Sequence, residues 1–173
     1  MGAMEEVLPP QTESGAGFES TAVRQFTIFM ENRVGKLQAL VRGYEGLHGR
    51  IVGLMVQNSA DTALVRMICS DADLARDVLT GEGFSFTEQE LLVVMLPKRA
   101  AHPLLQISAA LLAAEINIHY MYPLLISPKG PALALYVDDR VLASQLFIRK
   151  GFTLLAESDL AQLGGRGNSG ENN

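Results

Sequence analysis

The residues best suited to contacting a small molecule lie in one short segment, Glu31–Leu37. The Asn32 amide can both donate and accept hydrogen bonds, so it can meet an ammonium or a carboxylate group. Gly35 permits close backbone approach and dihedral angles that other residues avoid. A helix is expected to begin here, and the unpaired N–H groups at a helix start suit a carboxylate. The candidate ligand-binding residues are Asn32, Arg33, Val34, Gly35, Lys36 and Leu37.

A simpler interpretation of this segment stays open. Asn and Gly favour turns whether or not a ligand binds there, so the pair by itself also fits plain turn chemistry. Leu37 is expected to attach the following helix to the core.

Residue types used in catalysis do not form a constellation in this chain. Cys69, the single cysteine, follows an apolar run and is expected to be a small buried hydrophobic residue. As a nucleophile it would need a nearby histidine base, and the sequence indicates none. Four acidic residues lie near the starts of expected helices and are better explained by N-capping and by complementing the helix dipole: Asp71, Asp73, Asp138 and Asp139. We therefore expect no catalytic residue, no metal ligand and no cofactor.

An enzyme with its chemistry hidden in an interface is the competing class. It would need a pocket that joins His119, Tyr120 or Tyr122 with an acidic side chain. Small α+β folds host many activities, so fold class does not exclude this.

Composition narrows the function classes further. The formal net charge of −5 and the lack of a basic cluster argue against nucleic-acid binding. No apolar run approaches the roughly 18 residues of a membrane span, and no signal-peptide pattern opens the chain. With 48% hydrophobic and 19% charged residues, the chain is expected to be globular and cytoplasmic.

The hydrophobic pattern predicts the elements that hold the candidate turn. Val23–Met30 alternates like a half-buried strand, and Lys36–His48 has the apolar spacing of a helix. Two β-rich runs follow, and a second helix is expected to be capped by Ser70 or Asp71. A further strand is clearest at Glu90–Leu96, which gives the order βαββαβ.

The second half of the chain repeats the first. Leu104, Ile107 and Leu111 echo Leu37, Leu40 and Tyr44 with a constant offset of 67 residues. The duplication predicts an α+β fold of two ferredoxin-like βαββαβ units, with antiparallel sheets and the helices on one face. The expected segments are a mobile arm (1–21), the first unit (22–90), the second unit (91–160) and a mobile tail (161–173).

These stretches resemble a known family. VRQFTIFMENRVGKLQAL followed by IVGLMVQNSADTALVRMICSDADLARDVLTGEGFSF is similar to an ACT domain, and LLVVMLP through EINIHYMYPLL to VDDRVLASQLFIRKGF is similar to another. Together they resemble the stand-alone tandem ACT-domain proteins of bacteria. The resemblance implies amino-acid binding at the turn between the first strand and first helix, at interfaces between paired domains. Some relatives are labelled acetolactate-synthase-like.

The resemblance carries over unevenly to the two units. The first unit keeps Asn32 and Gly35 where the family contacts its ligand. In the second unit, a histidine stands at the glycine position. We therefore expect a degenerate second site at His102, Pro103 and Leu104.

The expected function is that of a non-catalytic amino-acid-binding regulator of amino-acid metabolism. It is expected to be a homodimer that passes its signal to a separate enzyme. The alternative is a small regulatory or structural subunit of a biosynthetic enzyme such as acetolactate synthase.

Overall fold

The computed structural model describes residues 21–164. The first unit contains β1 (Ala22–Glu31), α1 (Lys36–Arg42), β2 (Ile51–Ser59), β3 (Thr62–Cys69), α2 (Ala72–Gly81) and β4 (Ser85–Met95). The second contains α3 (Pro103–Leu112), β5 (Ile118–Pro123), β6 (Ala132–Val137), α4 (Arg140–Arg149) and β7 (Leu154–Leu155), and α5 (Glu157–Ala161) follows it. Apart from residue 21, the expected arm lies outside the described residues, as does the expected tail beyond residue 164.

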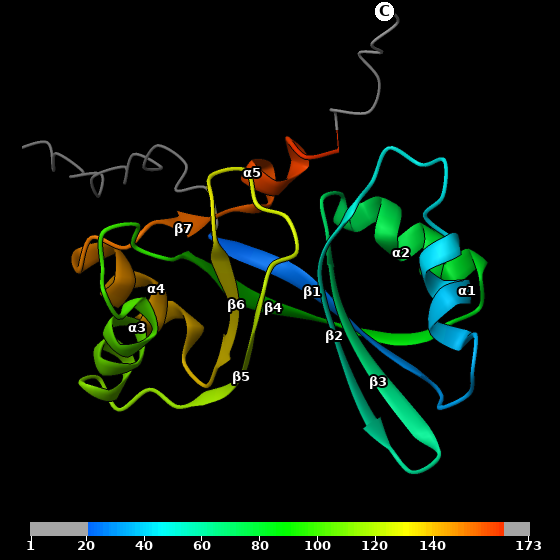
Figure 1. The fold of residues 1–173 in the computed structure, drawn as a ribbon, viewed down its shortest axis with the longest axis horizontal. Coiled ribbons are helices and arrows are strands. Elements are labelled where there is room, and N and C mark those ends of the chain that lie inside the picture. The colour runs from blue at the N-terminus through cyan, green and yellow to red at the C-terminus, as the bar shows by residue number, and fades with distance from the viewer. Residues whose placement is uncertain (1–20, 165–173) are drawn as a thin grey trace, which may run out of the picture.

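The described strands form one antiparallel sheet in the order β2-β3-β1-β4-β6-β5, with β7 also paired to β4 (Figure 1). The order β2-β3-β1-β4 in the first unit and the order β5-β6-β4-β7 in the second are each the strand order of a ferredoxin-like unit. The predicted fold class is therefore confirmed: the chain folds as two such units in tandem.

Strand β4 belongs to both units. Leu92 pairs with Ala22 of β1 on one side and with Leu135 of β6 on the other. The next two residues, Val93 and Val94, no longer pair with β1 and pair with β7 instead. The last strand of the first unit is thus also the first strand of the second. A division of the chain at residue 90 stays a prediction, because the strand runs through that position without a break.

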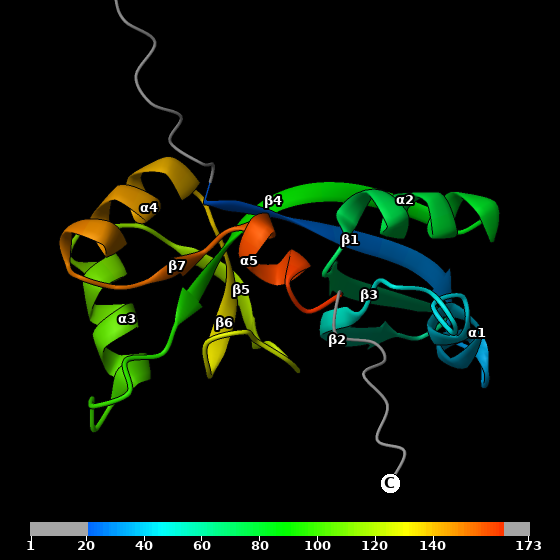
Figure 2. The ribbon, with the colours of Figure 1, turned by 90° about the horizontal axis from the view of Figure 1, so that it is seen from above.

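The helices of the two units lie at opposite ends of the molecule (Figures 1 and 2). Helices α1 and α2 cover a core that contains Phe26, Ile28 and Leu79, and α3 and α4 cover one that contains Ile107 and Phe147. A third apolar cluster joins the two units through their strands and α5, with members Val23, Val52, Ile68, Leu91, Val93, Leu155 and Leu160. The two units are therefore packed on a common apolar cluster, called the shared interior below.

Helix α5 was not expected from the sequence. Figure 2 shows it between the two units, where Leu160 is 1% exposed and Leu163 packs against the shared interior. The chain is therefore ordered through residue 164, beyond the start of the expected tail at residue 161.

The two outer strands of the sheet meet at one point. Gly53 of β2 forms an isolated bridge with Leu124, and Leu125 N donates to Val52 O at 2.8 Å. A Cβ atom at Gly53 would lie 2.9 Å from Leu124 Cδ2, so a larger residue here would displace the Leu124 side chain.

Two local predictions need correction. Helix α1 ends at Arg42 instead of His48, because the chain turns at Gly43 and again at Gly46, which has a φ of 76°. Leu37 was expected to hold this helix to the core but is 37% exposed, and Leu40 is the buried residue of the helix. The Asp71 cap, by contrast, is confirmed: its side chain accepts from Leu74 N at 2.9 Å.

Candidate functional site

The turn between β1 and α1 is anchored to the β2–β3 hairpin. Asn32 N donates to Asp61 O at 3.1 Å, and Asn32 Nδ2 donates to Ala60 O at 3.3 Å. Lys36 N donates to Arg33 O at 3.2 Å within the turn itself. These bonds fix the turn in place while all six candidate residues remain exposed.

Gly35 gives this turn its shape. Its φ of 87° lies in the left-handed region that side chains disfavour, and it forms the N-cap of α1 without a side-chain cap. No other group lies within 4 Å of the position a Cβ would take, so the approach to Gly35 is open. Val34 beside it is fully exposed. The turn presents backbone and amide groups to solvent at the edge of the first unit.

The corresponding turn of the second unit borders a hollow of about 830 Å³. His102 is the N-cap of α3 without a side-chain cap bond, and Pro103 opens the helix. The wall of the hollow is mostly apolar: Leu96, Ala101, His102, Pro103, Leu104, Leu105, Met121, Tyr122, Pro123 and Leu133. His102 therefore leaves this site open, and the predicted degeneracy of the second turn stays a prediction.

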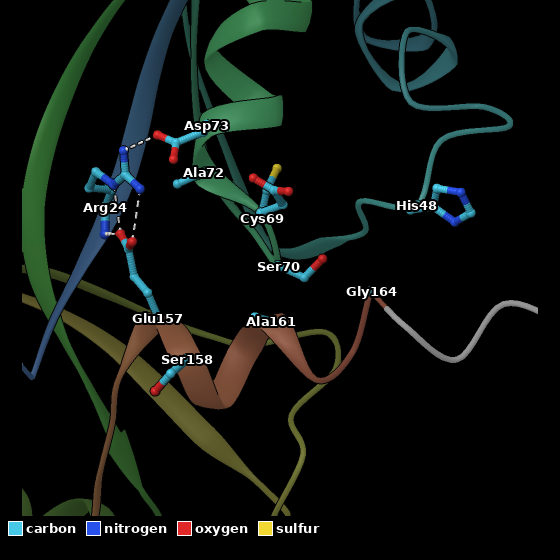
Figure 3. A pocket seen from close by; sticks show the side chains of 11 residues that line it. Arg24, His48, Cys69, Ser70, Ala72, Asp73, Glu157, Ser158, Ala161 and Gly164 are labelled. Atoms are coloured by element: carbon cyan, nitrogen blue, oxygen red, sulfur yellow. Dashed lines mark hydrogen bonds and ion pairs between the residues drawn. The ribbon is translucent and has the colours of Figure 1, made fainter. Parts of the chain in front are cut away.

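A second hollow, of about 430 Å³, lies between α2, α5 and the start of β1 (Figure 3). Arg24 at its wall binds the Glu157 carboxylate through Nε at 2.8 Å and Nη2 at 2.9 Å, and Asp73 through Nη1 at 2.7 Å. The hydrogen bonds to Glu157 and then Asp73 raise the pKa of Arg24. Arg24 and its acidic partners thus satisfy one another. Sequence reasoning missed this cluster, because Glu157 is 133 positions from Arg24.

The same hollow contains Cys69, which is 4% exposed. Burial is the main cause that raises the pKa of its thiol to about 12, so it stays protonated at neutral pH. The prediction that Cys69 is a small buried residue is confirmed.

The four acidic residues before helices divide into two kinds. Asp139 caps α4 by accepting from Leu142 N at 2.8 Å, as Asp71 caps α2. Asp73 is not a cap but lies in the first turn of α2, where its charge suits the helix dipole, and it is also paired with Arg24 and Arg76. Asp138 accepts from Asn117 N at 3.1 Å.

Within residues 21–164, no group of three or more His, Cys, Asp or Glu side chains is arranged to hold a metal ion.

A polar network crosses the shared interior. Gln25 of β1 is fully buried; its Nε2 donates to Tyr120 Oη and its Oε1 accepts from Tyr122 Oη, each at 2.7 Å. Thr27 and Tyr120 both donate to Gln89 Oε1, at 3.3 and 3.4 Å. Burial is the largest cause that raises the pKa of Tyr122, so its hydroxyl remains a donor. The alternation of Val23–Met30 predicts a half-buried strand, but Gln25 and Thr27 on its polar side are buried as well, and no sequence signal indicates this network.

The enzyme hypothesis required these tyrosines to meet an acid. Their hydrogen-bond partners within the described residues are amides, and His119 lies apart from them against the Tyr136 ring, with centroids 5.5 Å apart. The Arg66 guanidinium lies over the Tyr120 ring, with Cζ 4.1 Å from the ring centroid, and makes a cation–π contact. The structure therefore does not assemble an acid–base pair here.

No helix among residues 21–164 has the length and apolar character to span a membrane.

Comparison with known proteins gives a family. The family model described as an ACT domain pair matches residues 21–164. Protein BT0572 from Bacteroides thetaiotaomicron has a similar structure, with a TM-score of 0.73 and 25% identity over 83% of this chain and 99% of that one. The regulatory subunit of aspartate kinase from Thermus thermophilus, in its ligand-free form, has a TM-score of 0.51 and 8% identity over 75% and 93%. A search of curated proteins finds no match. Because the family match spans every residue that the structure describes, this chain belongs to the family of ACT domain pairs.

Proposed function

We propose that this protein is a non-catalytic regulator that binds an amino acid and controls a separate enzyme of amino-acid metabolism. The observation that carries the proposal is the ACT domain pair itself, since ACT domains are regulatory modules that bind amino acids. The open turn after β1 supports it, because this is where the family contacts its ligand.

The first turn offers groups of the right kind for an amino acid. Asn32 Nδ2 is bonded to Ala60, while within residues 21–164 no donor is bonded to its Oδ1, which suits an ammonium group. The exposed backbone around Gly35 suits a carboxylate. The proposed contact residues are those of the expected turn, Asn32–Leu37.

The second turn is an alternative position for the ligand. Its hollow is mostly apolar, so it would take an amino acid with an apolar side chain. Met121 and Leu104 line it and are 44% and 51% exposed, which leaves apolar surface for a ligand to cover.

Such a regulator acts by binding a partner protein. The regulatory subunit of aspartate kinase from Thermus thermophilus has a similar fold. This likeness fits a protein that controls a separate enzyme. We propose that the protein is a cytoplasmic homodimer and that ligand binding changes its affinity for the enzyme, as linkage requires. A small subunit of a biosynthetic enzyme such as acetolactate synthase is the alternative. That alternative predicts co-purification with the catalytic subunit and no amino-acid binding by this chain alone.

The test is a thermal-shift screen of the twenty amino acids, followed by calorimetry with those that raise Tm. At least one is expected to bind, and no binder among the twenty would contradict the proposal. For the first turn, Asn32→Ala is expected to weaken binding by about tenfold, the loss of one hydrogen bond to a charged group. Asn58→Ala, in the adjacent exposed hairpin, is the matched control.

A second pair of variants tests the other position. Met121→Lys places a charge in the apolar hollow, whereas Leu112→Lys changes an exposed residue of α3 outside it. Loss of binding in Met121→Lys together with wild-type affinity in Asn32→Ala would assign the ligand to the second turn.

A further inference from the structure

The buried Gln25 amide stands between the two candidate turns. It lies on β1, which runs directly into the Asn32–Leu37 turn. Its partner Tyr122 lies on β5 and lines the hollow of the second turn. A single 2.7 Å hydrogen bond thus joins the wall of one candidate site to the strand that carries the other.

The network around Gln25 has a fixed direction. The Tyr122 hydroxyl donates to Gln25, Gln25 donates to Tyr120, and Tyr120 donates to Gln89. Thr27, two residues after Gln25 on β1, also donates to Gln89. Each hydroxyl proton has an acceptor, and the Gln25 amide has a partner on both its nitrogen and its oxygen.

A buried network of this kind resists partial rearrangement. Removing one partner leaves a buried donor or acceptor unpaired, which costs about 1–3 kcal/mol. A shift of β5 against β1 therefore breaks several bonds together or none. The elements on either side move as a unit, because β1 is also paired along its length with β3 and β4.

We propose that the Gln25–Tyr122 hydrogen bond couples the two turns, so that filling the apolar hollow of the second unit changes the affinity of the Asn32–Leu37 turn. This deepens the proposed function and rests on it, since the coupling serves amino-acid binding. By reciprocity, a ligand at the first turn changes the second to the same degree.

The first experiment needs no ligand. Amide hydrogen exchange by NMR is measured at Asn32 and Lys36, whose N–H groups are hydrogen-bonded in the turn. Tyr122→Phe keeps the ring and removes the hydroxyl. It is expected to speed exchange at both amides by about fivefold, the equivalent of one hydrogen bond.

The matched control is Tyr136→Phe. Tyr136 stacks on Tyr120 at 5.0 Å, but within residues 21–164 its hydroxyl makes no hydrogen bond. In Tyr136→Phe, the amide exchange rates at Asn32 and Lys36 are expected to equal those of the wild type. An unchanged turn in Tyr122→Phe, or an equal rise in both variants, would overturn the proposal.

A second variant tests the coupling in case Tyr122→Phe does not fold. Tyr120→Phe removes the other hydroxyl bound to Gln25 and is expected to give the same faster exchange at the turn. Wild-type exchange at the turn in a folded Tyr120→Phe protein would likewise count against the coupling.

The ligand arm uses L-leucine, an apolar amino acid suited to the hollow. Calorimetry is expected to show an affinity change of about fivefold between the wild type and Tyr120→Phe, which breaks the network at a residue that does not line the hollow, and none for Tyr136→Phe. If no amino acid binds but exchange responds to Tyr122→Phe, the proposed function fails, and of the coupling only the structural link between Tyr122 and the turn stands. If L-leucine binds and exchange does not respond, only the coupling fails.

Discussion

The Glu157 carboxylate accepts three hydrogen bonds from Arg24: from the backbone N at 2.9 Å, Nε at 2.8 Å and Nη2 at 2.9 Å. The two residues belong to α5 and β1, at opposite ends of the described chain. The contact holds the last helix over the junction of the two units.

Replacement of Glu157 tests this contact. Hydrogen bonds to charged groups contribute about 1.5–3 kcal/mol, but this pair is partly exposed, so Glu157→Ala is expected to lower the free energy of unfolding by about 1 kcal/mol. Urea unfolding measures the change. Glu45→Ala, an exposed residue of the α1–β2 loop, is the control and is expected to be neutral. Equal stability of both variants would contradict the prediction.

The dihedral angle of Gly35 supports a second prediction. Gly35→Ala is expected to destabilise the protein by about 1 kcal/mol, because its φ of 87° is costly for a side chain although the space around it is open. Gly81→Ala, which has equally open space at the end of α2 but no positive φ, is expected to be neutral or stabilising. Thermal unfolding compares the two, and a Gly35→Ala protein as stable as Gly81→Ala would count against the assigned backbone conformation.

The Cys69 thiol is expected to be unreactive in the folded protein. Its pKa is raised to about 12 by burial, so the thiolate is scarce at pH 8 and access is poor. A colorimetric thiol reagent should react only as fast as the protein unfolds, and rapidly in denaturant. Fast labelling without denaturant would show that this hollow opens readily.

The pH dependence of stability follows from Asp159. Its hydrogen bonds with Lys129 and the Ala156 backbone lower its pKa below the usual 3.8. A lowered folded pKa means that the stabilisation is present above pH 3.8 and is lost as the pH falls through the folded value. Tm is therefore expected to fall below about pH 4. Asp159→Asn should have a lower Tm at pH 7 and a smaller fall; an identical pH profile would refute this.

Most of the fold could be predicted because its signals are local. Short stretches of sequence indicate the strand around Phe26 and Ile28 and the helix capped by Asp71. Similar patterns recur in the second half of the chain. The end of α1 could not be predicted in this way, because the apolar spacing of Val41 and Leu47 continues past the glycines that end the helix.

The contacts between the units could not be predicted in the same way. Gln25 meets Tyr122, and Arg24 meets Glu157, only because the sheet curls and brings distant strands and α5 together. The hollow beside His102 likewise depends on where β5 and β6 lie. Such positions carry no periodic signal, so only the three-dimensional arrangement reveals them.

The shared strand β4 sets a limit on how the two halves can be inherited. Its first part, Ser85–Leu92, pairs with β1 of the first half, and its last part, Leu92–Met95, pairs with β6 and β7 of the second, so the two halves share one strand of the chain. A gene fragment that ended before Leu91 would remove hydrogen-bonding partners of β1, and one that began after Met95 would leave β6 and β7 without their common neighbour. Recombination could therefore exchange the pair as a whole, but not either copy as a separate cassette.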